Sequence, residues 1–424
     1  MRGKNGFVAL CRVILALVFI FSGFVKAVDP WGTAIKLSEY FHAFGLGALQ
    51  GMAMFFSILL SSVEMLLGFC TLFRLGFAKR RTPTFMLIVM AFFTLLTLIL
   101  AIWNPVSDCG CFGDAVKLTN WQTFFKNWIL LGLAVVMWIG NRPQQPRWSA
   151  LEYTSGKEHH GHGLEWSLGF MFLLFSVGVG LYSLRHLPVI DFLPFQAGTD
   201  LTARSDTSKV NLITTLIYKD KTTGENHEFT LSDTTWYDTT RWEFVDTRFT
   251  EHKNPNAGEI HPLLAEFSIF DANGDHTDQL LATPSEWLMV TVTDPEQLSE
   301  TCRMRLALLT QYAQDRNIPI IGVTSAPLTD STLKVGILRI PLYNMDGTTL
   351  KSLIRTHQGV IALKDGVILA KWDCRDIPDF TRSSSILSYV TAQTAHSHAV
   401  WFIGVCAAVL VLLYIGYFVY RRCE

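Results

Sequence analysis

The sequence predicts an α-helical membrane bundle that carries one mixed α/β domain between its last two membrane helices. Three observations lead to this prediction. Half of the residues are apolar and only 17% are charged, against about 25% charged residues in soluble proteins. Six apolar stretches approach the roughly 20 residues that a membrane-spanning helix needs. Most charged residues lie between positions 195 and 385, which indicates a folded aqueous domain in that part of the chain.

The six stretches are each predicted to form one transmembrane helix. They are Phe7–Ala27, Met52–Phe73, Thr84–Trp103, Phe124–Gly140, Glu165–Leu184 and Val400–Tyr420. The first has a basic start and an apolar run, as a signal peptide has. Because no clear small-residue cleavage site follows and further spans come directly after, we interpret it as a membrane helix.

Lysine and arginine placement predicts the orientation in the membrane. If six helices alternate, all four basic segments fall on one side, the cytoplasmic side. These are the start (Arg2, Lys4), the second connection (Arg74, Lys79, Arg80, Arg81), the fourth connection (Arg142, Arg147, Lys157) and the tail (Arg421, Arg422). The sequence thus predicts an integral membrane protein with both termini cytoplasmic and residues 185–397 extracytoplasmic. Its net charge of −1 provides no basic excess for a nucleic-acid partner.

The chain is predicted to contain five parts. Residues 1–140 form a four-helix module, and residues 141–164, with Pro143, Pro146 and several glycines, form a cytoplasmic linker. The remaining parts are the fifth helix at 165–185, the extracytoplasmic domain at 190–395 and the sixth helix at 398–420.

The extracytoplasmic domain mixes strand and helix signals. The expected strands are Val210–Lys219, Trp242–His252, Ala265–Phe270, Trp287–Thr293, Ile318–Thr324, Val360–Leu363 and Val367–Trp372, with one helix at Pro295–Arg316. The last two strands flank Lys364-Asp365-Gly366 and form a hairpin. A strand, helix and strand followed by a hairpin is a thioredoxin-like order.

The first candidate for chemistry is the loop 108–114, which follows the third helix and is predicted to be extracytoplasmic. Cys109 and Cys111 flank Gly110, and glycine permits a backbone tight enough for a small disulfide ring. Such a ring is expected to be strained and reducible. The pair is either redox-active or a fixed staple. A metal site is not predicted, because two thiolates are too few for structural zinc.

Residues 1–140 resemble the MauE/DoxX family of four-helix membrane proteins, known from methylamine utilisation and related redox contexts. The matching residues are Arg12, Ser22-Gly23, Lys26, Asp29-Pro30, Glu64, the loop from Cys109 to Asp114, and Asn127. The resemblance implies a role in maturing a disulfide-rich partner, or sulfur and quinone chemistry, and gives no support for methylamine as a substrate. The whole chain is similar to a Bacteroidetes-type group that adds a thioredoxin-like domain to this module. This resemblance implies that the membrane is the bacterial inner membrane.

Three charged residues of the helices are supporting candidates. We expect Arg12 and Glu64 to lie at similar depths and to pair, since isolated charges in a membrane are expensive. They are either a structural pair or part of a quinone or proton site. Lys26 lies on the same side as the cysteine loop, where an ammonium would lower a thiol pKa. Asp108 and Asp114 border the cysteines and complete the candidate set.

The predicted domain lacks the full thioredoxin motifs. Ser299, three residues before Cys302, replaces the attacking cysteine, and Gln358 stands where the related pattern has proline. The domain is therefore interpreted as a degenerate thioredoxin fold used for binding. Cys374 is its other cysteine and is left as a partner either for Cys302 or for the loop pair.

Two functions follow as hypotheses. The first is a membrane thiol-redox or maturation protein that exchanges disulfide or electrons at Cys109 and Cys111, with quinone as an optional cofactor. The second is a non-enzymatic membrane scaffold whose domain binds an envelope protein. Both imply the lipid bilayer and an envelope protein as partners.

Overall fold

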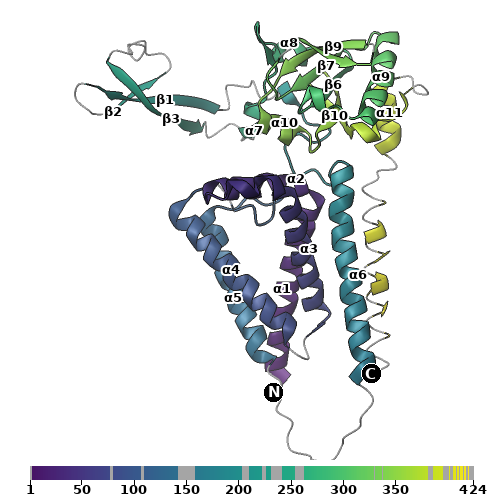
Figure 1. The fold of residues 1–424 in the computed structure, drawn as a ribbon. Helices are drawn as coiled ribbons and strands as arrows, with labels where there is room; N and C mark the ends of the chain where they lie inside the picture. Colours follow the sequence, from purple (N-terminus) through teal and green to yellow (C-terminus); the bar gives the residue numbers. More distant parts are fainter. Residues whose placement is uncertain are drawn as a thin grey trace, which may run out of the picture.

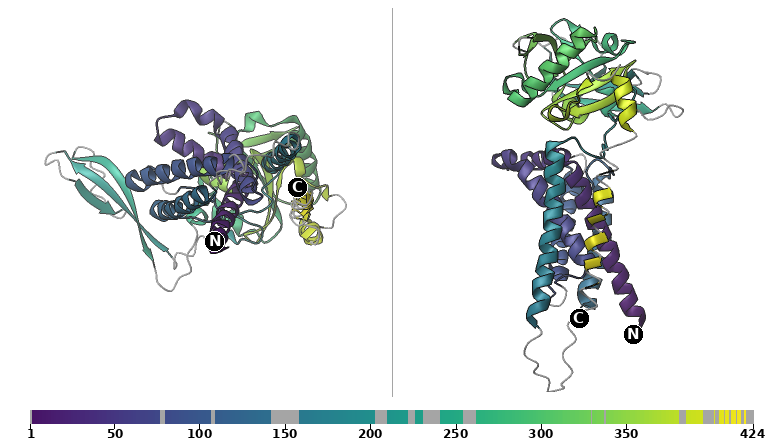
Figure 2. Two further views of the ribbon diagram at one scale, coloured as in Figure 1. Left: turned by 90° about the horizontal axis from the view of Figure 1, so that it is seen from below. Right: turned by 90° about the vertical axis from the view of Figure 1, so that its right-hand side faces the viewer.

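In the computed structural model, the chain forms a helical bundle with an α/β domain above it (Figures 1 and 2). The structure describes residues 2–401 apart from 77–79, 107–108, 142–157, 203–209, 222–225, 231–240, 254–261, 329, 337, 381–384 and 395–400, and describes parts of 404–419. Residues 142–157 of the predicted linker lie outside the described residues. Its last part, 158–164, was predicted wrongly, because the fifth long helix begins at Glu158 and not at residue 165.

Over its described residues, the N-terminal half contains six helices and one 3-10 turn. They are α1 (Arg2–Val28), α2 (Pro30–Ala43), η1 (Gly47–Met52), α3 (Ala53–Leu72), α4 (Arg81–Trp103), α5 (Asn120–Gly140) and α6 (Glu158–Arg185). In the described part of the chain, five helices are long and apolar enough to cross a membrane: Gly6–Val28, Gly47–Leu72, Arg81–Trp103, Asn120–Gly140 and Trp166–Arg185. Phe92, Leu95 and Ile88 of α4 point outward and are about 60% exposed, as expected of a lipid-facing surface. The chain is therefore an integral membrane protein.

The predicted sixth helix lies only partly among the described residues. A short apolar helix spans Gly404–Leu413. Its Leu413 is buried in one cluster with Phe172 of α6 and Met65 of α3, and Figure 1 shows this segment, in yellow, beside α6. A complete sixth span over 398–420 stays a prediction.

Helices α1 and α3 pack closely at two glycines. A Cβ atom on Gly23 would lie 2.6 Å from the backbone nitrogen of Met65, and one on Gly68 would lie 2.8 Å from that of Ile20. Small residues allow such close approach of membrane helices. These contacts fix the register of the two antiparallel helices.

Helix α2 lies across the end of the bundle that faces the α/β domain (Figure 1). Its Asp29 accepts a hydrogen bond from the Gly32 amide and is the N-cap, and Pro30 occupies the first turn, where its missing N–H costs nothing. A helix thus follows α1 after a single residue, and it turns the chain sideways over the membrane module.

The C-terminal domain is built on one mixed sheet with strand order β11-β10-β6-β7-β9-β4-β5, with β8 paired to β9. The strands are β4 (Phe270–Asp271), β5 (Gly274–Asp275), β6 (Trp287–Val292), β7 (Ile320–Thr324), β8 (Thr332–Val335), β9 (Leu338–Asn344), β10 (Gln358–Lys364) and β11 (Val367–Asp373). Strands β6, β7 and β9 are parallel, whereas β10 and β11 are antiparallel to their neighbours. Every residue of β6 is buried, as expected of a central strand.

Helices cover both faces of this sheet. Leu288 and Val290 of β6 pack in one core with Leu306 of α9 (Glu300–Asp315). Met289 of β6 packs in a second core with Leu353 of α10 (Gly347–Leu353). Figure 1 shows α10 on the side of the domain that faces α2. Short helices α7 (Pro262–Ala265), α8 (Thr277–Leu281) and α11 (Ile386–Thr394) complete the domain.

The predicted strands β6 and β7 and the hairpin of β10 and β11 are confirmed, but two predictions for this domain need correction. The helix expected from Pro295 begins at Glu300, because Ser299 caps it and Pro295–Gln297 forms a separate 3-10 turn. The strand expected at Ala265–Phe270 is wrong except for its last residue, since α7 ends at Ala265 and a short hairpin of β4 and β5 begins at Phe270. Its apolar side chains Phe267 and Ile269 fill the core from irregular backbone.

The two earliest predicted strands form a separate sheet. β1 (Val210–Asp220) pairs with β2 (Asn226–Thr230) and β3 (Trp242–Lys253) in the order β2-β1-β3. Figure 1 shows this sheet projecting sideways from the main domain.

Candidate functional site

The cysteine loop lies between α4 and α5, at the end of the bundle that faces α2. Gly110 and Gly113 adopt positive φ angles of 61° and 53°, which glycine reaches without the strain that a side chain would cause. The tight backbone brings the sulfur atoms of Cys109 and Cys111 to 2.7 Å. A shift of under about 1 Å would bring them to disulfide bonding distance.

Side chains from α1 and α2 hold the carbonyl groups of both cysteines. The Tyr40 hydroxyl donates to the Cys109 carbonyl at 2.6 Å. The Lys26 ammonium donates to the Cys111 carbonyl at 2.5 Å. The Ser22 hydroxyl lies 2.8 Å from the same Cys111 oxygen and accepts a hydrogen bond from Lys26 at 2.7 Å. The loop is thus fixed in place through its backbone carbonyl groups.

Lys26 also forms a buried ion pair with Glu64 of α3. The Nζ–Oε2 distance is 2.8 Å, and the two side chains are only 5% and 6% exposed. Ser22 lies 2.8 Å from the same carboxylate oxygen. A buried ion pair of this kind offsets its desolvation cost only when further hydrogen bonds satisfy both groups, and here Ser22 and the Cys111 carbonyl supply them.

The predicted pairing of Arg12 with Glu64 is wrong. Because Gly23 contacts Ser61 and Gly68 contacts Ala16, Arg12 lies level with the residues that follow the end of α3. That level is about ten residues, or about 15 Å, from Glu64. The depth estimate from the sequence failed because it assumed that both helices cross the membrane without offset.

The two thiols of the pair differ in acidity. The hydrogen bond between the two cysteines raises the pKa of Cys109, and burial raises it further. The same hydrogen bond lowers the pKa of Cys111 to about 7, and the ammonium groups of Lys126 and Lys26 add to this effect against the opposing effect of burial. In the reduced pair, Cys111 is therefore the more acidic thiol, and Cys109 keeps its proton. The thiolate is the reactive form of cysteine.

A cavity of about 440 Å³ opens beside the pair. Most of its lining is apolar, from side chains of α1 to α5. The polar residues of the lining are Ser22, Lys26, Thr33, Lys36, Tyr40, Glu64, Cys109, Cys111, Lys126 and Asn127. Cavities of this size and character are typical of sites for small organic molecules. The Asn127 amide group donates to the Thr97 hydroxyl at 3.3 Å, which orients it at this wall.

The C-terminal domain contributes one arginine to the surroundings of the loop. Arg355 follows α10, and its guanidinium lies 3.1 Å from Asp29 and 2.7 Å from Asp114. Asp114 is therefore held near the cysteines, whereas Asp108 lies outside the described residues. Sequence reasoning missed both Arg355 and Tyr40, since neither belongs to a motif.

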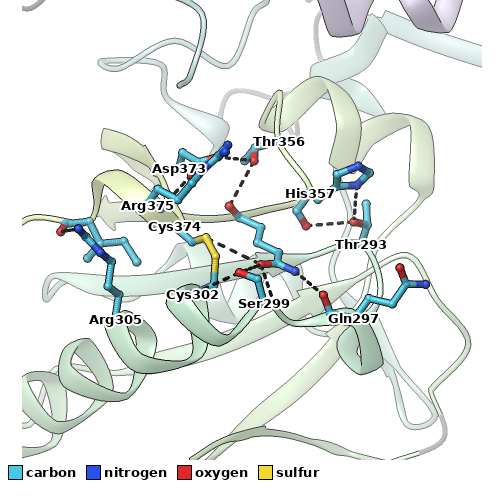
Figure 3. The surroundings of a disulfide bond; sticks show 12 residues. Thr293, Gln297, Ser299, Cys302, Arg305, Thr356, His357, Asp373, Cys374 and Arg375 are labelled. Atoms are coloured by element: carbon cyan, nitrogen blue, oxygen red, sulfur yellow. Dashed lines mark hydrogen bonds and ion pairs between the residues drawn. A yellow bond between two sulfur atoms is a disulfide. The ribbon is translucent and has the colours of Figure 1, made fainter. Parts of the chain in front are cut away.

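The C-terminal domain contains its own disulfide, between Cys302 at the start of α9 and Cys374 after β11 (Figure 3). Of the alternatives for Cys374, the structure has the bridge to Cys302, and both residues are 2% exposed. Gln358 lies between the elements that carry them. Its Oε1 atom is 3.8 Å from the Cys374 sulfur and 3.3 Å from the Ser299 hydroxyl, so Gln358 and Ser299 contact each other.

These features define a class of protein: a helical membrane module that presents a tight cysteine pair above a buried lysine–glutamate pair. Comparison with known proteins agrees with this class. Residues 4–140 match the model of the family described as methylamine utilisation protein MauE, so the membrane module of this chain is similar to that family.

The chain is also similar to a curated protein, Protein TlpB of Flavobacterium psychrophilum, with 28% identity over 127 residues. The match covers 30% of this chain and 35% of that protein, so it spans about a third of the relative's length. No solved structure matches the chain.

Proposed function

We propose that this chain is a membrane thiol-redox protein that exchanges disulfides with an envelope protein at Cys109 and Cys111. The observation that carries the proposal is the asymmetric pair itself. Cys111, with its pKa lowered to about 7, sits beside a protonated Cys109 with the sulfur atoms 2.7 Å apart. The charges of Lys26 and Lys126 favour the thiolate, as at the reactive cysteines of known thiol-redox sites.

The exchange proceeds in two balanced steps. The Cys111 thiolate attacks a disulfide of the partner, which forms a mixed disulfide and releases one partner thiolate. Cys109 then loses its proton and attacks the Cys111 sulfur, which closes the Cys109–Cys111 bond and releases the second partner thiolate. The partner gains two electrons and the pair loses two. The reverse sequence oxidises a partner dithiol.

The cavity beside the pair supports a second proposal, that a membrane quinone reoxidises it. A quinone would accept two electrons and two protons from the dithiol and leave as the quinol. The cavity borders both cysteines and the apolar interior of the bundle, which suits a ring with a lipid-soluble tail. To test this, reduced protein is mixed with a short-chain quinone and quinol formation is followed by absorbance, with Leu130→Trp as a cavity-filling variant. Quinol formation at the same rate by a Cys109→Ala, Cys111→Ala variant would rule out the role of the pair.

We further propose that the C-terminal domain is thioredoxin-like and extracytoplasmic. The strand order β11-β10-β6-β7, with α9 and α10 on opposite faces of the sheet, supports the fold, and the placement of basic residues supports the orientation. Ser299 and Gln358 replace the residues of dithiol chemistry, and Cys302 is bonded to a distant cysteine rather than to a neighbour in a helix-start motif. These features favour binding of an envelope protein over redox catalysis in this domain.

Alkylation trapping tests the main proposal. The redox state of Cys109 and Cys111 is measured in membranes equilibrated across a graded thiol–disulfide buffer. We expect interconversion with a midpoint above about −300 mV, because structural disulfides lie below that value. We also expect Cys109→Ser to trap a mixed disulfide through Cys111, with Cys70→Ser as the control. A pair that stays oxidised throughout would instead support the scaffold function.

A further inference from the structure

Arg355 belongs to the C-terminal domain and is buried where this domain contacts the membrane module. The residue is 7% exposed. Its Nε atom donates to the Asp29 carboxylate at 3.1 Å, and Nη2 donates to the Asp114 carboxylate at 2.7 Å. Nη1 donates to the Lys351 carbonyl of its own domain at 3.0 Å. Every nitrogen of the guanidinium thus has an acceptor, which is the arrangement that a buried arginine requires.

The two carboxylates belong to the two elements that frame the cysteine pair. Asp114 lies in the loop itself, three residues after Cys111. Asp29 caps α2, and α2 carries the Tyr40 hydroxyl that holds the Cys109 carbonyl. One guanidinium therefore connects the loop to the helix that lies across it.

The positive charge of Arg355 is needed to hold the carboxylates of Asp29 and Asp114 close together. Asp29 is 8% exposed. Burial raises the pKa of Asp29, the positive charge of Arg355 lowers it, and the negative charge of Asp114 raises it. Without Arg355, two nearby carboxylates would face each other with little solvent to screen them, and the loop would be repelled from α2.

The segment that carries Arg355 is anchored firmly in its own domain. The Thr356 hydroxyl donates to the Asp373 carboxylate at 2.6 Å. Asp373 directly precedes Cys374, and Gln358 contacts the Cys374 sulfur and Ser299. Figure 3 shows Thr356, Asp373 and Cys374 together at the disulfide. Arg355 is thus presented by a rigid part of the domain.

We propose that Arg355 is a positioning residue: by docking the C-terminal domain on Asp29 and Asp114, it holds the cysteine loop against α2 and limits access to Cys111. The proposal deepens the thiol-redox function and rests on it. Its test, however, measures access to Cys111 and does not require that the native pair exchanges disulfides. Under this proposal, release of the loop from α2 makes the Cys111 thiol more accessible to a partner.

The test measures labelling of Cys111 by a maleimide in the purified full-length protein in detergent. All variants carry Cys109→Ser, so that Cys111 is a free thiol whether or not the native pair exchanges disulfides. Labelling of a Cys109→Ser, Cys111→Ser variant is subtracted as background. We expect Arg355→Gln to raise the labelling rate at least threefold. We also expect its pH profile to move to higher pH, because a released loop moves away from Lys26.

Three further variants make the result specific. Arg339→Gln removes an exposed arginine of the same domain and is expected to change nothing. Arg355→Lys should restore part of the protection, since one ammonium can pair with a single carboxylate. If Arg355→Gln fails to fold, a triple variant replaces it, with Asp29→Asn and Asp114→Asn added to Arg355→Gln. This variant removes the repulsion between the two carboxylates together with their ion pairs to Arg355, and its Cys111 should still be labelled faster.

The positioning role would be overturned if Arg355→Gln and Arg339→Gln gave equal labelling rates and equal pH profiles. Where Arg355→Gln does not fold, the triple variant takes its place in this comparison. That result would leave the thiol-redox function standing, because the function is tested by the redox titration of the native pair. A native pair that never interconverts, with Cys111 nevertheless exposed by Arg355→Gln, would remove the redox function and keep the positioning role.

Discussion

Lys26 and Glu64 form the buried ion pair that supports the cysteine loop, with 2.8 Å between Nζ and Oε2. The same ammonium donates to the Cys111 carbonyl at 2.5 Å. A charge pair inside the bundle is therefore linked directly to the backbone of the loop. Substitutions here should affect both the stability of the bundle and the chemistry of the pair.

Lys26→Met should destabilise the bundle strongly. Glu64 would remain as a buried charge without its partner, which typically costs about 3–5 kcal/mol. The double variant Lys26→Met, Glu64→Leu removes both charges and should recover most of that loss. Thermal unfolding of the detergent-solubilised protein measures both.

Lys36→Met is a matched control for this prediction. Lys36 forms a more exposed pair with Glu39, with side chains 26% and 42% exposed, and such pairs contribute about 0–1 kcal/mol. If Lys26→Met were as stable as Lys36→Met, the buried pair would have no stabilising role.

The acidity of Cys111 gives a second prediction. Since its pKa is lowered to about 7, the alkylation rate of reduced protein should rise with pH through a midpoint near that value. Lys126→Met removes a charge that lowers the pKa, so the midpoint should move to higher pH. Lys117→Met, in an exposed part of the same loop, should leave it in place. A midpoint near the ordinary value of 9.0 in the unaltered protein would contradict the asymmetry of the pair.

The sequence predicts the elements of this site better than their partners. Apolar length locates the membrane helices, and the residue types of Cys109-Gly110-Cys111 are enough to identify the loop. The partner of Glu64 was assigned wrongly because it depends on the register of α1 against α3, which Gly23 and Gly68 set by close packing. Such contacts leave no periodic signal.

Contacts between segments that are far apart in the sequence could not be predicted either. Arg355 is separated from Asp29 by 326 positions, and an isolated arginine after a short helix has no motif. Strands β8 and β9 and helix α10 were also missed. Their polar residues and glycines, as in the start of α10 at Gly347-Thr348-Thr349, resemble a loop, and only packing against the sheet makes them regular.

Asp373 should make the protein sensitive to acid. Burial alone would raise the pKa of this carboxyl, but hydrogen bonds from Arg375 and Thr356 bring it below its ordinary value of 3.8. Because the folded-state pKa is the lower one, this stabilisation is fully present above about pH 4 and is lost as the pH falls through the folded-state value. Unfolding midpoints measured from pH 6 down to 2.5 should therefore fall less steeply for Asp373→Asn than for the unaltered protein. Asp278→Asn, at an exposed position, should keep the original slope, and a slope unchanged by Asp373→Asn would exclude this role.

The Cys302–Cys374 disulfide should stabilise the C-terminal domain without taking part in thiol exchange. It joins α9 to the end of β11 across 72 positions, with a Cα–Cα distance of 5.3 Å. Loops of this length correspond to about 4 kcal/mol in the chain-entropy description, and measured values are typically about 2–4 kcal/mol. The double variant Cys302→Ala, Cys374→Ala should lose stability of that order in denaturant unfolding of the full-length protein. The same variant should keep the redox midpoint of Cys109 and Cys111 if the two centres are chemically independent. The opposite result would be a midpoint that shifts with this variant while the matched Cys70→Ala variant leaves it unchanged. It would show that the two cysteine pairs are coupled. The anchored segment from Arg355 to Gln358 is the physical connection between them.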